Sequence, residues 1–177
     1  FILNKEQLQA LNFLETKNTG FNVSVLQGTT GSGKTLVYFE RIKKIIKRNY
    51  QALVLLPEIF LTNDFKSRFE EYFGFEPAVW HSKITPKQKR VIWKGVINNN
   101  IKILVGARSA LLLPFKKLGV IIVDEEHDSS YKQDEGVIYN ARDMAISRAS
   151  FEKIPIHLVT SVPSIETYNN ILNKKYR

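Results

Sequence analysis

Residues 28 to 35 read Gly-Thr-Thr-Gly-Ser-Gly-Lys-Thr, the full spacing of a loop that binds the phosphates of a nucleoside triphosphate. Glycine tolerates backbone conformations that other residues avoid, so successive N–H groups of such a loop can point at phosphate oxygens. Lys34 supplies a charge for the β- and γ-phosphates, and the Thr35 hydroxyl enters the shell of a Mg²⁺ ion. The alternative is a flexible turn, but an apolar run precedes the loop and a helical pattern follows it. The candidate nucleotide-binding residues here are Gly28, Thr29, Thr30, Gly31, Ser32, Gly33, Lys34 and Thr35.

A second polar segment, Asp124-Glu125-Glu126-His127-Asp128, follows the apolar run 120–123 and begins 90 residues after Lys34. An apolar strand that ends in Asp places a carboxylate at the edge of a sheet, where it can hold Mg²⁺, and the next Glu can polarise an attacking water. This pair favours hydrolysis over transfer to an organic acceptor; the alternative is an acidic strand end that caps a helix. The candidate catalytic residues are Lys34, Asp124, Glu125 and His127, and the metal candidates are Thr35 and Asp124.

The elements that must position these residues alternate along the chain. Short runs rich in Val, Ile and Leu predict strands at 23–26, 52–56, 77–80, 101–105, 120–123 and 156–159. Helices are predicted at 5–15, 34–48, 61–73, 85–98, 141–151 and 164–174. Such alternation is typical of an α/β fold, a parallel sheet with helices on both faces, and a RecA-like P-loop NTPase satisfies it. The motifs should then meet at the carboxyl ends of the strands.

Composition limits the class of protein. The chain has 177 residues, 44% of them hydrophobic, which suits one globular domain, and it contains no cysteine. No apolar run is long enough to cross a bilayer and no signal peptide opens the chain, so we expect a cytoplasmic protein with no membrane partner. A net charge of +9 indicates an anionic partner such as nucleic acid, although solvated helix faces would also explain it. The first residue, Phe1, suggests a fragment of something longer.

The string from Asp124 to Gln133, Asp-Glu-Glu-His-Asp-Ser-Ser-Tyr-Lys-Gln, resembles motif II of superfamily 2 helicases. In its full length it resembles one family among them, the primosomal protein N′ (PriA) family of bacterial replication-restart DNA helicases. The resemblance extends from Leu3 to about Thr167. Further matching segments are Leu3-Asn-Lys-Glu-Gln7, Leu56-Pro-Glu-Ile-Phe-Leu-Thr62, Trp80-His-Ser82, Gly106-Ala-Arg-Ser-Ala-Leu111 with Pro114-Phe115, and Tyr139-Asn-Ala-Arg-Asp143.

The resemblance implies that residues 1–177 form the first RecA-like, ATP-binding lobe of an ATP-dependent 3′ to 5′ DNA helicase. It implies forked and single-stranded DNA, primosome proteins and single-strand-binding protein as partners. A second lobe, a zinc-binding insertion and an N-terminal DNA-binding domain would lie outside this chain, so zinc is expected only there. Because a second lobe can supply a catalytic arginine worth roughly 10³ to 10⁵ in rate, the isolated lobe should bind ATP but hydrolyse it weakly.

The resemblance also assigns roles to single residues. Gln7 corresponds to a glutamine that reads adenine, and His127 to a histidine that links the nucleotide site to the nucleic-acid face. Two departures stand out. The family usually shows Ser-Ala-Thr where this chain has Thr160-Ser161-Val162, and a histidine where it has Asn140. Val162 cannot donate a hydroxyl hydrogen bond, although Thr160 or Ser161 could substitute for it.

Candidate DNA-binding or coupling residues surround these motifs. Aromatic and cationic side chains alternate just beyond the acidic segment, and such side chains can stack on bases and contact phosphates. Alternatively, the tyrosines could pack in the core and Arg142 could pair with Asp143. Arg108 and Ser109 could contact a DNA phosphate, or the arginine could pair with a carboxylate. Thr62 could bind a phosphate or cap a helix. The full set is Thr62, Arg108, Ser109, Tyr131, Lys132, Tyr139 and Arg142.

Other functions are compatible with a phosphate-binding loop alone. A non-enzymatic module that binds nucleotide and docks a partner, or another superfamily 2 DNA translocase, remains open. A P-loop kinase or a switch GTPase is a third class. No Asn/Thr-Lys-x-Asp guanine motif occurs after the phosphate loop, and no acceptor pocket can be named for a kinase.

Overall fold

Six parallel strands form the central sheet of the protein. The computed structural model describes residues 1–17, 19–29, 33–133 and 139–177, leaving aside the side chains at 132, 133 and 139. The strands lie side by side in the order β1-β8-β5-β2-β4-β3, and each neighbouring pair is parallel. Their bounds are β1 (Asn22–Gln27), β2 (Gln51–Leu55), β3 (Ala78–Trp80), β4 (Ile103–Gly106), β5 (Leu118–Asp124) and β8 (Pro155–Thr160). All six predicted strands are therefore confirmed.

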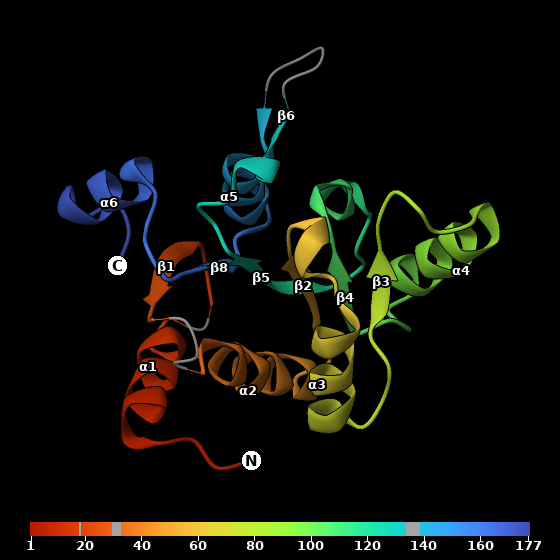
Figure 1. The fold of residues 1–177 in the computed structure, drawn as a ribbon, viewed down its shortest axis with the longest axis horizontal. Helices are drawn as coiled ribbons and strands as arrows, with labels where there is room; N and C mark the ends of the chain where they lie inside the picture. Colours follow the sequence, from red (N-terminus) through yellow and green to blue (C-terminus); the bar gives the residue numbers. More distant parts are fainter. Residues whose placement is uncertain (18, 30–32, 134–138) are drawn as a thin grey trace.

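Helices cover both faces of this sheet (Figure 1), as an α/β fold of the RecA-like type requires. One face carries α1 (Lys5–Glu15), α2 (Lys34–Lys47) and α3 (Asn63–Phe73), and the other carries α5 (Ala141–Glu152) with the 3₁₀ turn η2 (Arg108–Leu112). The helix α4 (Pro86–Ile97) lies beyond β3, and α6 (Ile165–Leu172) lies at the opposite end of the sheet. Two further 3₁₀ turns are η1 (Glu58–Phe60) and η3 (Ser129–Tyr131), and the short antiparallel strands β6 (Lys132–Gln133) and β7 (Tyr139–Asn140) precede α5.

Local sequence fixes several helix starts. Asn4 and Gln7 form a reciprocal capping box at α1, and Thr85 with Gln88 forms another at α4. The predicted helix 61–73 begins later, at residue 63, because the Thr62 side chain accepts a hydrogen bond from Phe65 N and caps it there. No helix among the described residues is long and apolar enough to cross a membrane.

The sheet separates two apolar cores. All residues of β2, β5 and β8 are buried, which explains why these strands read as continuous apolar runs rather than as alternating ones. Two buried polar groups join a helix to the sheet: Arg41 Nε of α2 donates to His157 Nε2 of β8 at 3.2 Å. Burial, together with the nearby Arg41 and Arg177, lowers the pKa of His157 well below its usual range, so this imidazole is neutral.

The carboxyl ends of the strands meet at one rim, as predicted. Gly28 N donates to Thr160 O at 3.2 Å, which joins the start of the phosphate loop to the end of β8. Leu56 N donates to Gly106 O at 2.9 Å, which joins the ends of β2 and β4. The residues predicted to do chemistry therefore share one edge of the sheet.

Candidate nucleotide-hydrolysis site

The described part of the phosphate loop leads directly into α2. Gly33 sits at the N-cap of that helix with φ 79°, in the left-handed region that favours glycine, and no side chain caps the helix there. A Cβ at Gly33 would also collide with the side-chain amide of Gln7. Lys34 Nζ donates to Gly28 O at 2.7 Å and to Thr29 O at 3.0 Å, so the ammonium group lies inside the loop. Thr30, Gly31 and Ser32, also predicted to bind nucleotide, lie outside the described residues.

Gln7 lies beside this loop. Its Nε2 donates to Gly33 O at 3.3 Å, while its Oε1 accepts from Asn4 N at 2.9 Å. A cavity of about 200 Å³ opens here between the start of α1 and the end of β1, with Gln7, Gly28 and Lys34 in its lining. Adenine recognition by Gln7 stays a prediction, and this cavity is where it would occur.

Asp124 ends β5 and is almost fully buried. Its Oδ2 accepts from the Tyr38 hydroxyl at 2.9 Å and its Oδ1 accepts from Glu125 N at 2.8 Å. Burial raises the pKa of Asp124 to about 6, although the Tyr38 hydrogen bond opposes this shift. Tyr38 did not figure among the predicted site residues; its position three residues after Thr35, on the same side of α2, is the signal that could have identified it.

The predicted metal ligands share a second cavity. It has a volume of about 190 Å³, and Thr35, Asp124 and Glu125 line it together with Thr62 and Arg68. A hydroxyl and carboxylates are the hard oxygen donors that Mg²⁺ prefers, so the residues present fit this ion. The carboxylate of Asp124 is therefore buried at the place where a divalent cation would compensate its charge.

We expect Asp124→Asn to stabilise the fold at neutral pH by up to about 3 kcal/mol, because the amide removes a buried charge and can still bond Tyr38 and Glu125 N. The folded pKa of about 6 exceeds the usual 3.8, so the folded wild type binds more protons between these values and loses stability as pH rises through them. The advantage of the variant should grow from about pH 4 to about pH 6 and then level off. Denaturant unfolding without Mg²⁺ or nucleotide measures this.

The control for this experiment is Asp64→Asn, at an exposed carboxylate in the lining of the same cavity. His157 contributes a pH dependence of the opposite sign, but it is present in both proteins and cancels in the difference. Equal stabilities of Asp124→Asn and wild type at pH 7 would contradict the prediction.

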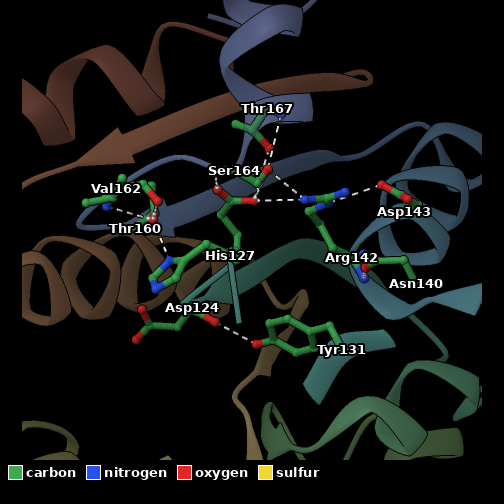
Figure 2. A network of polar contacts seen from close by, with 11 residues as sticks. Asp124, His127, Tyr131, Asn140, Arg142, Asp143, Thr160, Val162, Ser164 and Thr167 are labelled. Carbon is green, nitrogen blue, oxygen red and sulfur yellow. Dashed lines mark hydrogen bonds and ion pairs between the residues drawn. The ribbon is translucent and has the colours of Figure 1, made fainter. Parts of the chain in front are cut away.

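Glu125 and His127 lie next to each other at the rim. Glu125 has φ 51°, an uncommon backbone conformation for a residue with a side chain, and its carboxylate is partly exposed. His127 Nε2 lies 3.5 Å from Glu125 Oε2. Figure 2 shows the other contact of the ring, in which His127 Nδ1 lies 2.8 Å from Thr160 Oγ1. The imidazole thus stands between the carboxylate at the end of β5 and the hydroxyl at the end of β8.

The Thr160 hydroxyl makes the polar contacts that the Val162 side chain cannot make, and its substitution for a coupling hydroxyl stays a prediction. It donates to Val162 O at 2.7 Å and accepts from Val162 N at 3.1 Å. A hydroxyl has only one proton, so His127 Nδ1 must be the donor in its contact with Thr160. The side chain of Val162 is largely exposed and is not needed for this link.

Glu126 points into the protein, whereas the side chain of Glu125 is partly exposed. It is buried, and its Oε1 accepts from Ser164 N at 2.8 Å while its Oε2 accepts from Thr167 Oγ1 at 3.0 Å. Oε2 also accepts from Arg142 Nη1 at 3.2 Å, in an ion pair whose two side chains are nearly inaccessible (Figure 2). This carboxylate joins α5 to α6 and cannot reach a nucleotide.

Arg142 was predicted to bind DNA or couple to it, and this role stays a prediction. Its side chain is buried, and its Nε donates to Asp143 Oδ1 at 3.1 Å, which is the ion pair weighed as the alternative. Burial would lower the pKa of Arg142, but the carboxylates of Asp143 and Glu126 raise it overall, so the group stays charged. Asn140 caps α5 by accepting from Arg142 N at 2.9 Å, which gives this departure from the family a structural role.

Tyr131 is also buried, so its ring presents no free face in this conformation, and DNA binding by this residue stays a prediction. Its hydroxyl donates to Asp124 O at 2.6 Å and lies 3.0 Å from Leu55 O, between the ends of β5 and β2. A coupling role through these carbonyls stays a prediction. The side chains of Lys132 and Tyr139 lie outside the described ones.

The remaining candidates lie at the surface of the rim. Ser109 and Thr62 are exposed, and Arg108 is partly exposed with its Nη1 donating to Ser130 O at 3.3 Å. Thr62 caps α3 and also lines the cavity that contains Asp124. Phosphate contacts by these three residues stay predictions.

Comparison with known proteins decides the family. The model of the DEAD/DEAH box helicase family matches residues 4–170. The chain belongs to this family. Among curated members, the replication restart protein PriA of Rickettsia felis is 47% identical over 99% of the chain, and that of Haemophilus influenzae is 45% identical over 99%. The PriA of Bacillus subtilis is 43% identical over 82% of the chain.

This DEAD/DEAH box chain spans about a quarter of the length of those relatives, 26% of the Rickettsia and 24% of the Haemophilus protein. Solved structures share its fold at low identity. RecG bound to a three-way DNA junction superposes with a TM-score of 0.72 at 22% identity, covering 99% of this chain and 23% of that one. The helicase MrfA bound to DNA and AMPPNP gives 0.66 at 17% identity, covering 98% and 26%. The RecA-like fold is thereby confirmed.

Proposed function

We propose that this chain is the ATP-binding motor lobe of a DNA helicase that acts in replication restart and primosome assembly. The observation that carries the proposal is the position of His127 between Glu125 and Thr160. This contact joins the carboxylate placed to activate water to the end of β8. A change at the γ-phosphate can therefore be transmitted to the strand end and to α6 beyond it, which a passive nucleotide-binding module would not need.

In this proposal ATP occupies the loop from Gly28 to Thr35, with its adenine beside Gln7. Mg²⁺, when bound, neutralises phosphate charge beside Thr35 and Asp124. Lys34 binds the β- and γ-phosphates, and Glu125 orients the attacking water and accepts its proton. In this proposal zinc would bind only in a part of the protein that lies outside this chain.

The proposed polymer substrate is forked or single-stranded DNA, unwound in the 3′ to 5′ direction in the cytoplasm. Sequence identity near 45% with PriA proteins over almost the whole chain supports this choice over another superfamily 2 translocase. Primosome proteins and single-strand-binding protein are the proposed protein partners. Since RecG and MrfA are each seen with DNA, a DNA-bound state of this fold has precedent.

The test is ATP hydrolysis by the full-length protein with and without forked or single-stranded DNA. We expect DNA to stimulate wild-type hydrolysis and Lys34→Ala to abolish both basal and stimulated rates, because the β/γ-phosphate contact is lost. Lys43→Ala, at an exposed lysine of the same helix, is the matched control. Hydrolysis without DNA stimulation would contradict the helicase assignment, and nucleotide binding without hydrolysis would favour the non-enzymatic module. The isolated lobe should bind ATP and hydrolyse it only weakly.

A further inference from the structure

The positive charge of the chain is concentrated in one segment. Residues 77–123 contain nine of the 26 Lys and Arg residues and none of the 17 Asp and Glu residues. Everywhere else, 17 cationic residues balance 17 acidic ones, so this segment accounts for the whole net charge of +9. It comprises β3, α4, β4, η2 and most of β5. Four of its cations, Lys87, Lys89, Arg90 and Lys94, lie on the single helix α4.

Among the described helices of 11 or more residues, α4 also has the fewest buried side chains. Val96 is its only buried residue, whereas Val91 is 61% exposed and Trp93 is 46% exposed. Figure 1 shows the helix standing beyond β3, the last strand of the sheet. A large aromatic side chain left half in water beside a row of cations is unlike an ordinary solvated helix face.

The two tryptophans of the chain meet at this place. Trp80, the last residue of β3, and Trp93 line a cavity of about 340 Å³ whose other lining residues are Lys89, Arg90 and Lys94. Lys89 Nζ lies 6.0 Å from the centre of the Trp80 ring. Within the described residues, none of these three cations has an ion pair with a carboxylate. We call Trp80, Lys89, Arg90, Trp93 and Lys94 the tryptophan patch.

The tryptophan patch continues the rim on which the predicted phosphate contacts lie. Trp80 is in register with Gly106 across β3 and β4, and Ala107 N donates to Trp80 O at 3.0 Å. Ala107 directly precedes Arg108 and Ser109. A strand of nucleic acid that passes these two residues could therefore reach Trp80 without leaving the surface of the lobe.

We propose that the tryptophan patch binds single-stranded DNA, stacking one or two bases on Trp80 and Trp93 and contacting phosphates through Lys89, Arg90 and Lys94. Base stacking requires an exposed aromatic face, which Trp93 supplies beside the partly exposed Trp80, and phosphates require cations without acidic neighbours, of which the patch has three. An acidic protein tail would use the cations too, but the continuity with Arg108 and Ser109 favours a polymer that follows the rim. The inference rests on the proposed function only in taking DNA as the partner.

The chain is suited to a direct test because its only two tryptophans both lie in the patch. Titration with oligothymidine should quench their fluorescence, since a stacked base quenches an indole. Three phosphate contacts predict a slope of about −2 for log affinity against log salt on a single strand. Inorganic polyphosphate, a polyanion without bases, should bind more weakly and leave the emission largely unchanged.

Variants separate stacking from charge. We expect Trp93→Ala to bind oligothymidine about tenfold more weakly than wild type does, as measured by the fluorescence anisotropy of a labelled oligonucleotide. The double variant Lys89→Glu/Lys94→Glu should lose most of the affinity and the salt dependence. Its matched control is Lys43→Glu/Lys47→Glu, which makes the same charge change at two exposed positions of α2 and should bind as wild type does. Circular dichroism checks that each variant is folded.

The outcomes separate this inference from the proposed function. Lys34→Ala should bind no ATP yet keep its quenching by DNA, whereas Lys89→Glu/Lys94→Glu should keep ATP binding and lose quenching. Unchanged tryptophan emission with oligothymidine would overturn the inference while leaving the ATPase assignment intact. Stronger quenching by an acidic, apolar peptide than by DNA would also overturn it, and so would equal effects of the two double variants.

Discussion

Replacing Glu125 with glutamine should lower DNA-stimulated ATP hydrolysis by about 10²- to 10⁴-fold, the usual contribution of a positioned general base. Glutamine keeps the shape of the side chain and the left-handed backbone at this position, so the loss comes from the missing proton acceptor. ATP binding should persist, because neither Lys34 nor the loop carbonyls that contact it change. Steady-state hydrolysis by the full-length protein and binding of a fluorescent ATP analogue measure the two effects.

Glu71→Gln, at an exposed carboxylate of α3, is the control and should leave hydrolysis unchanged. The thermal midpoint of Glu125→Gln should also match that of wild type, because this carboxylate is partly exposed and its neighbour His127 also contacts Thr160. A Glu125→Gln protein that hydrolyses ATP at the wild-type rate would show that another group activates the water.

A substitution one residue later, at Glu126, has a different expected result. Glu126→Ala should destabilise the fold by about 3–5 kcal/mol, since it leaves the buried charge of Arg142 with only the exposed carboxylate of Asp143 as an ionic partner. It also removes acceptors from Ser164 N and Thr167 Oγ1. For a domain of this size, each kcal/mol shifts the midpoint by roughly 2–4 °C, so a fall of about 10 °C is expected.

Two further variants test the reason for this loss. Glu126→Gln keeps an acceptor oxygen and should cost less than Glu126→Ala. The double variant Glu126→Leu/Arg142→Leu removes both buried charges and should recover much of the stability, because the ion pair is costly to break but not to replace. If Glu126→Ala costs less than about 1 kcal/mol, the network in Figure 2 does not hold α6 to the sheet.

The sequence was sufficient for the fold because two independent signals agree. Continuous apolar runs indicate strands covered on both faces, and the phosphate-binding loop fixes the order of strand, loop and helix around Lys34. The motifs at Asp124 and Gly106 then had to meet at one rim, since the carboxyl ends of parallel strands lie together. Capping boxes such as that of Asn4 and Gln7 account for the accuracy of the helix starts.

The roles of individual polar residues were harder to predict. Three consecutive acidic residues look alike in sequence, yet Asp124 lies at the cation cavity, Glu125 faces His127, and Glu126 is buried against Arg142. Which of them faces inward depends on the unusual backbone at Glu125, and no local pattern encodes it. Alternating aromatic and cationic residues are compatible with a DNA-binding surface and with a buried position. Tyr131 and Arg142 are buried here because they bond to Leu55 O and to Glu126, partners that are distant in the sequence.

The order of strands in the sheet has a consequence for synthesis of the protein. β1 carries the phosphate loop near the start of the chain, but its partner in the sheet is β8, which ends at Thr160. At a translation rate of about 5–20 residues per second, β1 therefore waits on the order of 10 s on the ribosome before its partner emerges. Val23 and Leu26, both buried in the finished fold, are unpaired during that interval. We therefore expect the nucleotide pocket to be one of the last parts of the lobe to form during synthesis.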